Sequence, residues 1–345
     1  MSNLAHQRSV TPPPRVRFSG STLSNLVAVY GLLLVFLLIM LIFGLLRPSS
    51  FFSATNINTI MVSQSVTAIL AFAEMVPLAT KQFDLSIGYH LGMAQVLVVG
   101  LQITQGLAWP EAAALVLLAS LLTGVINGVL VTYLRIDSFI ATMGTGTLLY
   151  GVTNWYSNGE QISGMGLPDS FTNLTQIFHG LPLPAVYVAV IAVALWIVTE
   201  RLPVGRNLYV IGANVRAAEL TGIDVRRHVM GAFVVSGLLS GFAGIVLGSI
   251  LQTGTPSVGP EYLLPAFAAT LLGATSIKPG RVNVIGTLLS VLVLAFSFSG
   301  VQQLGAPFYV QYFFNGGILV VAVGLSVYAA RRRQRAAISA KPRGT

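Results

Sequence analysis

Long apolar runs determine what this chain can fold into. The first run, Leu26–Leu46, contains no charged residue and is long enough to cross a lipid bilayer as a helix, which takes about 20 residues. Nine further runs follow, at about 57–80, 86–105, 111–133, 138–157, 184–200, 229–251, 262–276, 282–301 and 309–329. Because backbone polar groups in lipid must be satisfied within the protein, these runs predict an all-α polytopic membrane protein with about ten transmembrane helices.

Composition agrees with this class. Charged residues make up only 8% of the chain and the mean hydropathy is +0.79, whereas soluble domains are about one quarter charged. The absence of cysteine excludes disulfides, thiol catalysis and Cys-ligated metals. The net charge of +9 does not indicate nucleic-acid binding, because the basic residues flank apolar runs, where they orient a membrane protein. Small residues recur at helical spacing in Gly124–Gly128 and Gly237–Gly241–Gly244, which predicts close helix packing.

The positions of Lys and Arg predict the orientation. With ten spans and a cytoplasmic N-terminus, the inside segments hold all of the 19 Lys and Arg residues except Arg47, and shifting the count by one span breaks this asymmetry. Both termini are then cytoplasmic, and the largest outside loop is 158–183. The run at 262–276 is short and contains Pro265, as in a broken or re-entrant segment. The 82–88 connection is a second candidate for dipping into the membrane.

The polar stretch from Thr199 to Gly231 separates two long apolar runs. It predicts one short helix, Val215–Thr221, with Asn214 as N-cap and Gly222 closing the C-terminal end in the left-handed conformation. A helix this short is unstable alone in water, so a surface must hold it. Two surfaces fit: lipid head groups, or a groove on a soluble partner.

No motif indicates an enzyme. The chain lacks GxxxxGK[ST], HExxH and GxSxG, and Lys occurs only at positions 81, 278 and 341, which leaves no place for a variant P-loop. We therefore expect no catalytic residue, no metal and no cofactor in this chain.

Few ionisable groups are predicted at membrane depth. Glu74 lies within the second run, where a carboxylate is costly unless it faces a cavity or a partner. We hypothesise that Glu74 faces a substrate cavity; the alternative is a protonated carboxyl that donates to a neighbouring helix. Asp84, His90 and Glu261 lie near run ends, and the Glu261 carboxylate also suits a helix N-terminus.

Polar and aromatic residues gather in two further segments, Thr153–Gln161 and Ser299–Gly305. Trp155 is typical of an interfacial aromatic belt. Alternatively, Trp155 stacks on a sugar ring while Asn154 or Gln302 bonds its hydroxyls. The candidate residues of a substrate pathway are therefore Glu74, Asp84, Asn154, Trp155 and Gln302.

GRNLYVIGANVRAAELTGIDV, followed by GAFVVSGLLSGFAGIVLGSIL, resembles the main cytoplasmic loop and next helix of ribose-type ABC sugar permeases. Four more segments agree in order: FDLSIG (Phe83–Gly88), GVINGVLVTYLRIDSFIATMGT (Gly124–Thr145), PEYLLPAFAATLLGATSI (Pro260–Ile277) and GRVNVIGTLL (Gly280–Leu289). The resemblance covers residues 55–330. The chain departs from it at 81–83, where the family usually has two glycines, and in SFSGVQQLG, where an asparagine-glycine pattern is common.

The resemblance implies a multi-pass permease subunit of an importer in the bacterial plasma (inner) membrane. Two such subunits, identical or paralogous, would form the pathway, with a cytoplasmic sugar-type ATPase below and a periplasmic or lipid-anchored sugar-binding protein above. ATP would be bound by the ATPase, and the partners would include lipid but no nucleic acid. The family's polar stretch maps onto Asp84, Ser86 and Gly88.

The family's coupling segment maps onto Gly212–Gly222. Its expected ATPase-coupling residues are Asn214, Val215, Arg216, Ala217, Ala218, Glu219, Leu220 and Thr221. Ala217 and Ala218 are expected to enter a groove on the ATPase, with Arg216 and Glu219 at its rim.

We therefore expect a polar cytoplasmic tail (1–24), a transmembrane permease domain (25–330, with the coupling loop at 201–228) and a basic cytoplasmic tail (331–345). The expected function is ATP-driven uptake of a monosaccharide or related polyol. An ATP-independent secondary transporter or facilitator would instead need paired carboxylates or histidines at membrane depth, or a lined pore. A structural scaffold would have no substrate pathway.

Overall fold

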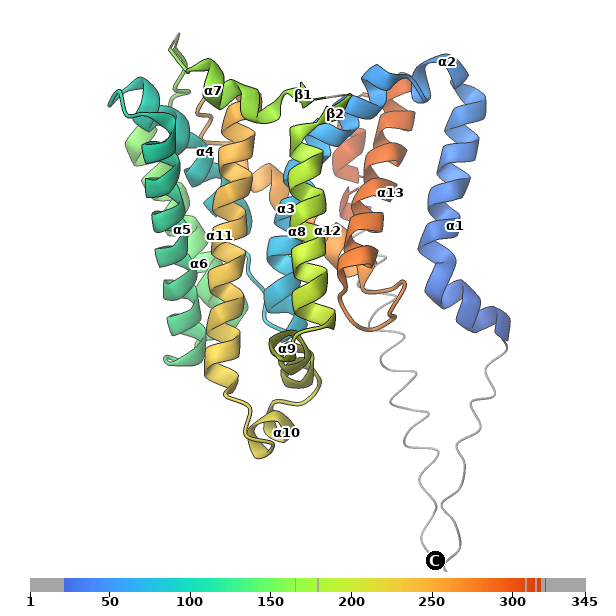
Figure 1. The fold of residues 1–345 in the computed structure, drawn as a ribbon, viewed down its shortest axis with the longest axis vertical. Helices are drawn as coiled ribbons and strands as arrows, with labels where there is room; N and C mark the ends of the chain where they lie inside the picture. The colour runs from blue at the N-terminus through green and yellow to red at the C-terminus, as the bar shows by residue number, and fades with distance from the viewer. Residues whose placement is uncertain are drawn as a thin grey trace, which may run out of the picture.

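The computed structural model describes residues 22–164, 166–178, 180–307, 309–313, 315–317 and 320, and is built almost entirely from helices (Figure 1). The helices are α1 (Thr22–Leu46), α2 (Pro48–Phe51), α3 (Ala54–Ala79), α4 (Ile87–Ile103), α5 (Trp109–Thr132), α6 (Ser138–Ser157), α7 (Asp169–Thr172), α8 (Leu183–Glu200), α9 (Pro203–Ala213), α10 (Val215–Leu220), α11 (Val225–Leu251), α12 (Leu263–Gly273) and α13 (Val284–Gln303). Short 3-10 helices η1 (Asn173–Thr175) and η2 (Gly259–Tyr262) and an antiparallel pair, β1 (Ile177–Phe178) and β2 (Leu181–Pro182), complete the described elements.

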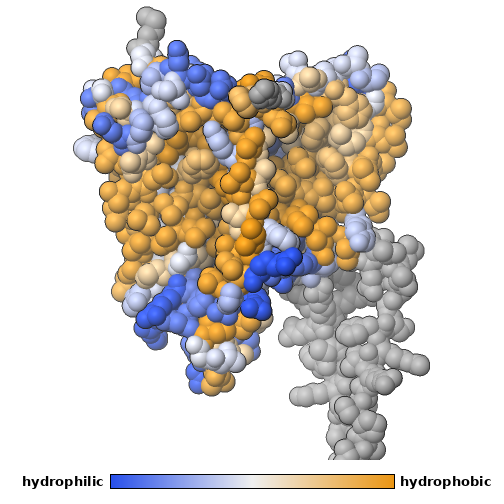
Figure 2. All heavy atoms as spheres, in the orientation of Figure 1, coloured by the Kyte–Doolittle hydropathy of each residue, from blue (hydrophilic) through white to orange (hydrophobic). Residues whose placement is uncertain are grey.

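The all-α polytopic prediction is confirmed. Within the described residues, α1, α3, α5, α8, α11 and α13 are long and apolar enough to cross a membrane, and α4 is a shorter apolar helix. Figure 2 shows the matching surface, an apolar belt around the middle with hydrophilic residues toward both ends. Each of the first nine expected runs overlaps one helix. The last run beyond position 320, the tail at 331–345 and residues 1–21 of the N-terminal tail lie outside the described residues.

Side-chain caps fix where several of these helices begin. Ser53 Oγ accepts from Asn56 N at the start of α3, at 3.2 Å. Asp137 Oδ1 accepts from Phe139 N at the start of α6, at 3.0 Å. Each cap satisfies a backbone N–H that the first helical turn leaves without a partner.

The bundle is arranged around α3 and α11. The described window of α3 is mostly buried, whereas α1 packs against α2 and α13 at one edge and is largely exposed, as a lipid-facing helix would be (Figure 1). Helices α5 and α6 lie at the opposite edge. The predicted close packing is present: a Cβ at Gly124 would lie 2.6 Å from Phe233 O, and one at Gly237 would lie 2.6 Å from Ser120 O. Helices α5 and α11 are therefore in backbone contact.

The segment around α12 is irregular, as Pro265 suggested. Helix α12 has 11 residues, a length of about 16 Å at 1.5 Å per residue, which is about half the hydrocarbon thickness. The preceding η2 lies directly on α4, because a Cβ at Gly259 would approach Gly88 O to 2.4 Å. A segment with this geometry needs shielding by neighbouring helices.

The two ends of the bundle differ. Helix α7 and the β1–β2 pair lie at one end, called here the hairpin end, and α9 and α10 lie at the other (Figure 1). Sequence analysis anticipated only α10 within the polar stretch and missed α9. Helix α9 begins with Pro203 at its first position and buries Leu208 and Ile211, which are three residues apart on one face.

Candidate functional site

A polar cavity of about 410 Å³ opens between α3, α13 and the η2–α12 segment. Its polar lining comes from Asn56, Thr59, Ser63, Gln64, Thr67, Glu261, Tyr262, Ser299, Gln302, Gln311 and Asn315. The lining residues of α3 come from its first half and those of α13 from its second half, so the cavity lies toward the hairpin end. Its volume falls within the range of about 300–1,000 Å³ that small-molecule sites occupy.

The chemistry of this lining is neutral and rich in hydrogen-bonding groups. Amides and hydroxyls dominate, Glu261 supplies a carboxylate, and no Lys or Arg of the described chain lines the cavity. The side chains of Gln64 and Gln302 form no hydrogen bond to the part of the chain that the structure describes, so their amides are available to a solute. The cavity therefore suits a small, uncharged, hydroxyl-rich molecule.

A short hydrogen-bond chain holds the rim of the cavity. Ser50 Oγ donates to Gln303 Oε1 at 2.7 Å, and Ser299 Oγ donates to Asn56 Oδ1 at 2.9 Å. Asn56 Nδ2 in turn donates to Phe51 O at 2.7 Å. These contacts join α2, α3 and α13, so the lining residues Asn56 and Ser299 are held in place by the elements around them.

Of the predicted pathway residues, the structure places Gln302 in the cavity and Asn154 and Trp155 elsewhere. The last two lie on α6, which packs against α4 and α5 at the far edge of the bundle. The Trp155 side chain is 79% exposed, and Asn154 Nδ2 donates to Tyr150 O within its own helix at 2.8 Å. An exposed Trp near the end of a membrane helix fits the interfacial belt rather than a sugar platform in this cavity.

Glu74 and Asp84 lie inside the bundle instead of lining the cavity. Both are buried, and Glu74 Oε2 accepts from Asp84 N at 3.2 Å. Asp84 Oδ2 accepts from Ser236 Oγ at 2.7 Å, and Asp84 Oδ1 accepts from the Ser86 amide and hydroxyl. Glu74 Oε1 has no hydrogen-bond partner within the described residues. The two carboxyl groups thus belong to an internal polar network that connects α3, α11 and the α3–α4 loop.

Helices α5 and α6 complete this network. Ser138 Oγ accepts from Phe83 N at 3.1 Å, and Thr142 Oγ1 accepts from Leu85 N at 2.9 Å. Asn127 Nδ2 donates to the Ser86 hydroxyl at 2.9 Å. The loop at 83–86 is therefore held from α3, α5, α6 and α11, which explains how a polar segment is accommodated between apolar helices. Sequence analysis missed Asn127, Ser138 and Ser236, since single small polar residues in apolar helices carry no distinctive pattern.

The predicted short helix is present as α10. Asn214 Oδ1 accepts from Ala217 N at 3.0 Å, which confirms the N-cap, and Gly222 has the expected positive φ of 81°. Arg216 pairs with Glu219 at 3.1 Å on the surface.

The expected role of Ala218 needs correction. Its side chain is 0% exposed and packs against Ile211, Val229 and Phe233 of the same chain, so it does not enter a partner's groove. The face of α10 that a partner could reach carries Val215 and Leu220, which are 45% and 76% exposed. Ala217 is also exposed.

Comparison with known proteins places these features in context. The sequence matches the family described as branched-chain amino acid transport system / permease component over residues 56–323. It is 33% identical over 314 residues to the ribose import permease protein RbsC of Bacillus subtilis, covering 91% of this chain and 95% of the relative. It is 30% identical to the D-allose transport system permease protein AlsC of Escherichia coli, covering 86% and 90%. It is 29% identical to the galactose/methyl galactoside import permease protein MglC of Haemophilus influenzae, covering 86% and 93%. No solved structure matches the chain.

Proposed function

Because the chain belongs to the branched-chain amino acid transport system / permease component family, we propose that it is the transmembrane permease subunit of an ATP-binding-cassette importer for a monosaccharide or related polyol. Its similarity to bacterial permeases and its six apolar spans among the described residues make it a multi-pass protein of the bacterial plasma (inner) membrane. The observation that carries the substrate class is the cavity lined by amides and hydroxyls.

The lining favours a sugar over a branched-chain amino acid. A free amino acid carries an ammonium, a carboxylate and an apolar side chain, so its site needs a cation near the carboxylate and an apolar pocket. The described lining supplies no Lys or Arg and many hydroxyl and amide groups. The relatives named for ribose, allose and galactose point to the same substrate class.

A second permease subunit would complete the pathway. Thr55, Thr59 and Ser63 form an exposed stripe along the first half of α3, at i, i+4 and i+8. A second cavity of about 520 Å³ lies along this stripe and also touches Ile177 and Ile250. Hydroxyl groups have no partner in lipid, so a polar stripe on a membrane helix is better covered by another permease subunit and by the solute path between the two.

Contacts at both ends of the bundle support the ten-span topology with cytoplasmic termini. Ile277 N donates to Val29 O near the start of α1 at 3.0 Å, which puts that start beside the α12–α13 loop. That loop also contacts α9, so the chain enters α1 from the α9–α10 end. Gln303 at the end of α13 bonds Ser50, so the chain leaves α13 at the hairpin end, from which one more span returns it to the first side. On this basis we retain a permease domain at 25–330 between two cytoplasmic tails.

The partners follow from this orientation. A sugar-type ATPase would bind α10 through Val215 and Leu220, and would bind and hydrolyse the ATP, with no cofactor and no catalytic residue in this chain. A sugar-binding protein would deliver solute at the hairpin end. ATP dependence separates this function from that of a secondary transporter or facilitator.

The test is uptake by proteoliposomes that contain the permease, its ATPase and its binding protein. We expect uptake of labelled ribose, allose or galactose that requires ATP on the ATPase side. Uptake driven by an ion gradient without ATP would support the ATP-independent alternative, and ATP-driven uptake of leucine but of no sugar would contradict the substrate class.

A further inference from the structure

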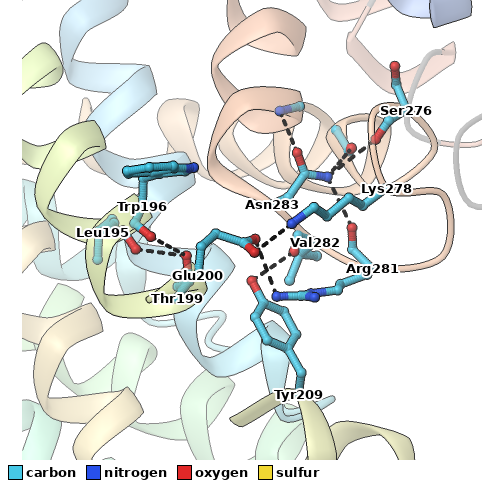
Figure 3. A network of polar contacts seen from close by, with 12 residues as sticks. Leu195, Trp196, Thr199, Glu200, Tyr209, Ser276, Lys278, Arg281, Val282 and Asn283 are labelled. Atoms are coloured by element: carbon cyan, nitrogen blue, oxygen red, sulfur yellow. Dashed lines mark hydrogen bonds and ion pairs between the residues drawn. The ribbon is translucent and has the colours of Figure 1, made fainter. Parts of the chain in front are cut away.

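Three separate elements converge on Glu200, the last residue of α8 (Figure 3). Its carboxylate is bridged by Lys278 Nζ at 2.5 Å and by Arg281 Nη2 at 3.3 Å. Lys278 and Arg281 both belong to the α12–α13 loop. The Glu200 side chain is mostly buried between them, so one carboxylate connects α8 to two positions of that loop.

Helix α9 reaches the same loop through Tyr209. The Arg281 guanidinium carbon lies 3.5 Å from the centroid of the Tyr209 ring, and Tyr209 Oη donates to Val282 O at 3.0 Å. Burial raises the pKa of Tyr209 and the neighbouring Arg281 lowers it, with burial the larger effect, so the phenol stays protonated and remains a donor. Arg281 is therefore held by a carboxylate from α8 and by an aromatic face from α9.

The α12–α13 loop is itself tightly organised by one buried side chain. Asn283 Nδ2 lies within hydrogen-bonding distance of the carbonyls of Gly273, Ser276 and Arg281, at 3.3, 3.2 and 3.1 Å. Its Oδ1 accepts from Gly286 N at 2.7 Å and so caps α13. A displacement of Arg281 is therefore passed to the start of α13 instead of being absorbed by a flexible loop.

Helix α13 continues to the cavity, and α9 continues to α10. Val291, Phe298 and Gln302 of α13 line the cavity. Asn214 is both the last cap of α9 and the first cap of α10, so no spacer separates the two helices. A continuous path of contacts thus runs from the exposed face of α10 through Tyr209, Arg281 and Asn283 to the cavity wall.

We propose that Glu200 is a positioning residue that transmits movement of α9 and α10 to α13 by holding Lys278 and Arg281 on one carboxylate. This inference rests on the proposed function, since the movement would originate in a bound ATPase. Ion pairs that are partly open to solvent contribute little to folding, so Glu200 affects coupling far more than stability. An interaction of this kind can change partners between two arrangements of packed helices.

The test compares Glu200→Gln with Asp224→Asn in the reconstituted complex. Asp224 pairs with Arg227 on the surface and its side chain caps α11, a role that Asn retains, but it does not touch the α12–α13 loop. The sugar is whichever of ribose, allose and galactose the wild-type complex takes up fastest. We expect Glu200→Gln to lower uptake at least five-fold with unchanged ATPase assembly and basal hydrolysis, so that more ATP is hydrolysed per sugar. Asp224→Asn should match the wild type.

A direct readout of movement uses a single cysteine on α13. The chain contains no cysteine, so Phe298→Cys provides a unique thiol in the cavity wall. Its labelling rate should change on adding ATP and vanadate to the complex, and the Glu200→Gln substitution should abolish that change. Arg281→Lys keeps the charge but loses the planar group over Tyr209, and it should show an intermediate loss without additional effect in the double variant.

Two results would overturn the proposal. One is a Glu200→Gln complex with normal uptake and a normal ATP-dependent change in labelling. The other is a fall in uptake and hydrolysis in equal proportion to the amount of folded permease, which would assign Glu200 to folding alone. Failure of the wild type to take up any of the three sugars would contradict the proposed substrate class, while the labelling comparison would still decide the role of Glu200.

Discussion

At the scale of single residues, Gln302 is the candidate pathway residue that the structure places in the cavity. Gln302→Ala removes an amide that can bond a sugar hydroxyl, and one such hydrogen bond contributes about 0.5–1.5 kcal/mol. We expect the KM for sugar uptake to rise about two- to ten-fold, with normal insertion because the side chain is exposed. Uptake kinetics in proteoliposomes measure this. Gln105→Ala, outside the cavity, is the matched control and should leave the KM unchanged.

Glu74 carries a different expectation now that its surroundings are known. Two carboxyl groups buried together in a membrane bundle favour a state in which one is neutral. The Glu74→Gln side chain resembles that neutral form and can still accept from Asp84 N, so uptake should stay within about two-fold of the wild type.

Glu74→Ala tests the same network from the other direction. It leaves the Asp84 amide without its acceptor and opens a void, at a cost of about 2–5 kcal/mol, and should lower the amount of folded permease in the membrane. Thermal stability in detergent, together with uptake per folded molecule, separates the two variants. A Glu74→Gln protein that folds but does not transport would instead assign the carboxylate a role in transport.

At the scale of elements, α10 has one face on its own bundle and one face open. Leu220→Asp changes only the open face, so we expect normal folding and loss of ATPase binding, measured by copurification and by sugar-stimulated ATP hydrolysis. Arg216→Ala should be mild, because an exposed ion pair contributes less than about 1 kcal/mol. Normal ATPase binding by Leu220→Asp would favour a helix that rests on lipid head groups.

Ala218→Trp is the complementary change in α10. The site is filled by Ile211, Val229 and Phe233, so a large side chain should displace α10 from the bundle. We expect increased proteolysis in the 201–228 loop as well as weaker ATPase binding. A Trp variant with an undisturbed loop and lost ATPase binding would contradict the assignment of Ala218 to the interior.

The sequence was informative about α10 up to a definite limit. Asn214 and Gly222 predict both ends of the helix, because capping is a local property. Which face of α10 is buried depends on contacts with Ile211 and Phe233 in other helices, and no local pattern encodes it. The cavity was missed for a similar reason. Asn56, Thr59 and Ser63 lie at the start of an apolar run, where polar residues also mark an ordinary membrane boundary.

At the scale of the whole molecule, topology is the property that the sequence predicts best, because charge asymmetry is a sum over many residues. With Gly164→Cys or Ser339→Cys as the only thiol, an impermeant maleimide added to intact cells should label position 164 and leave 339 unlabelled. Permeabilised cells should label both and serve as the control. Labelling of 339 alone in sealed cells would reverse the orientation and with it the assignment of the ATPase to α10.

The junction at Asn214 also limits which changes in chain length this protein can accept. One residue ends α9 and starts α10, so the direction of the exposed face of α10 depends on an unbroken residue count from Gly205 onward. Each added residue turns a helix by about 100° and advances it by about 1.5 Å. A single insertion beside Asn214 would therefore turn Leu220 away from a partner without altering any contacting side chain. Substitutions on the open face adjust affinity by degrees, whereas insertions at this junction change its aim all at once.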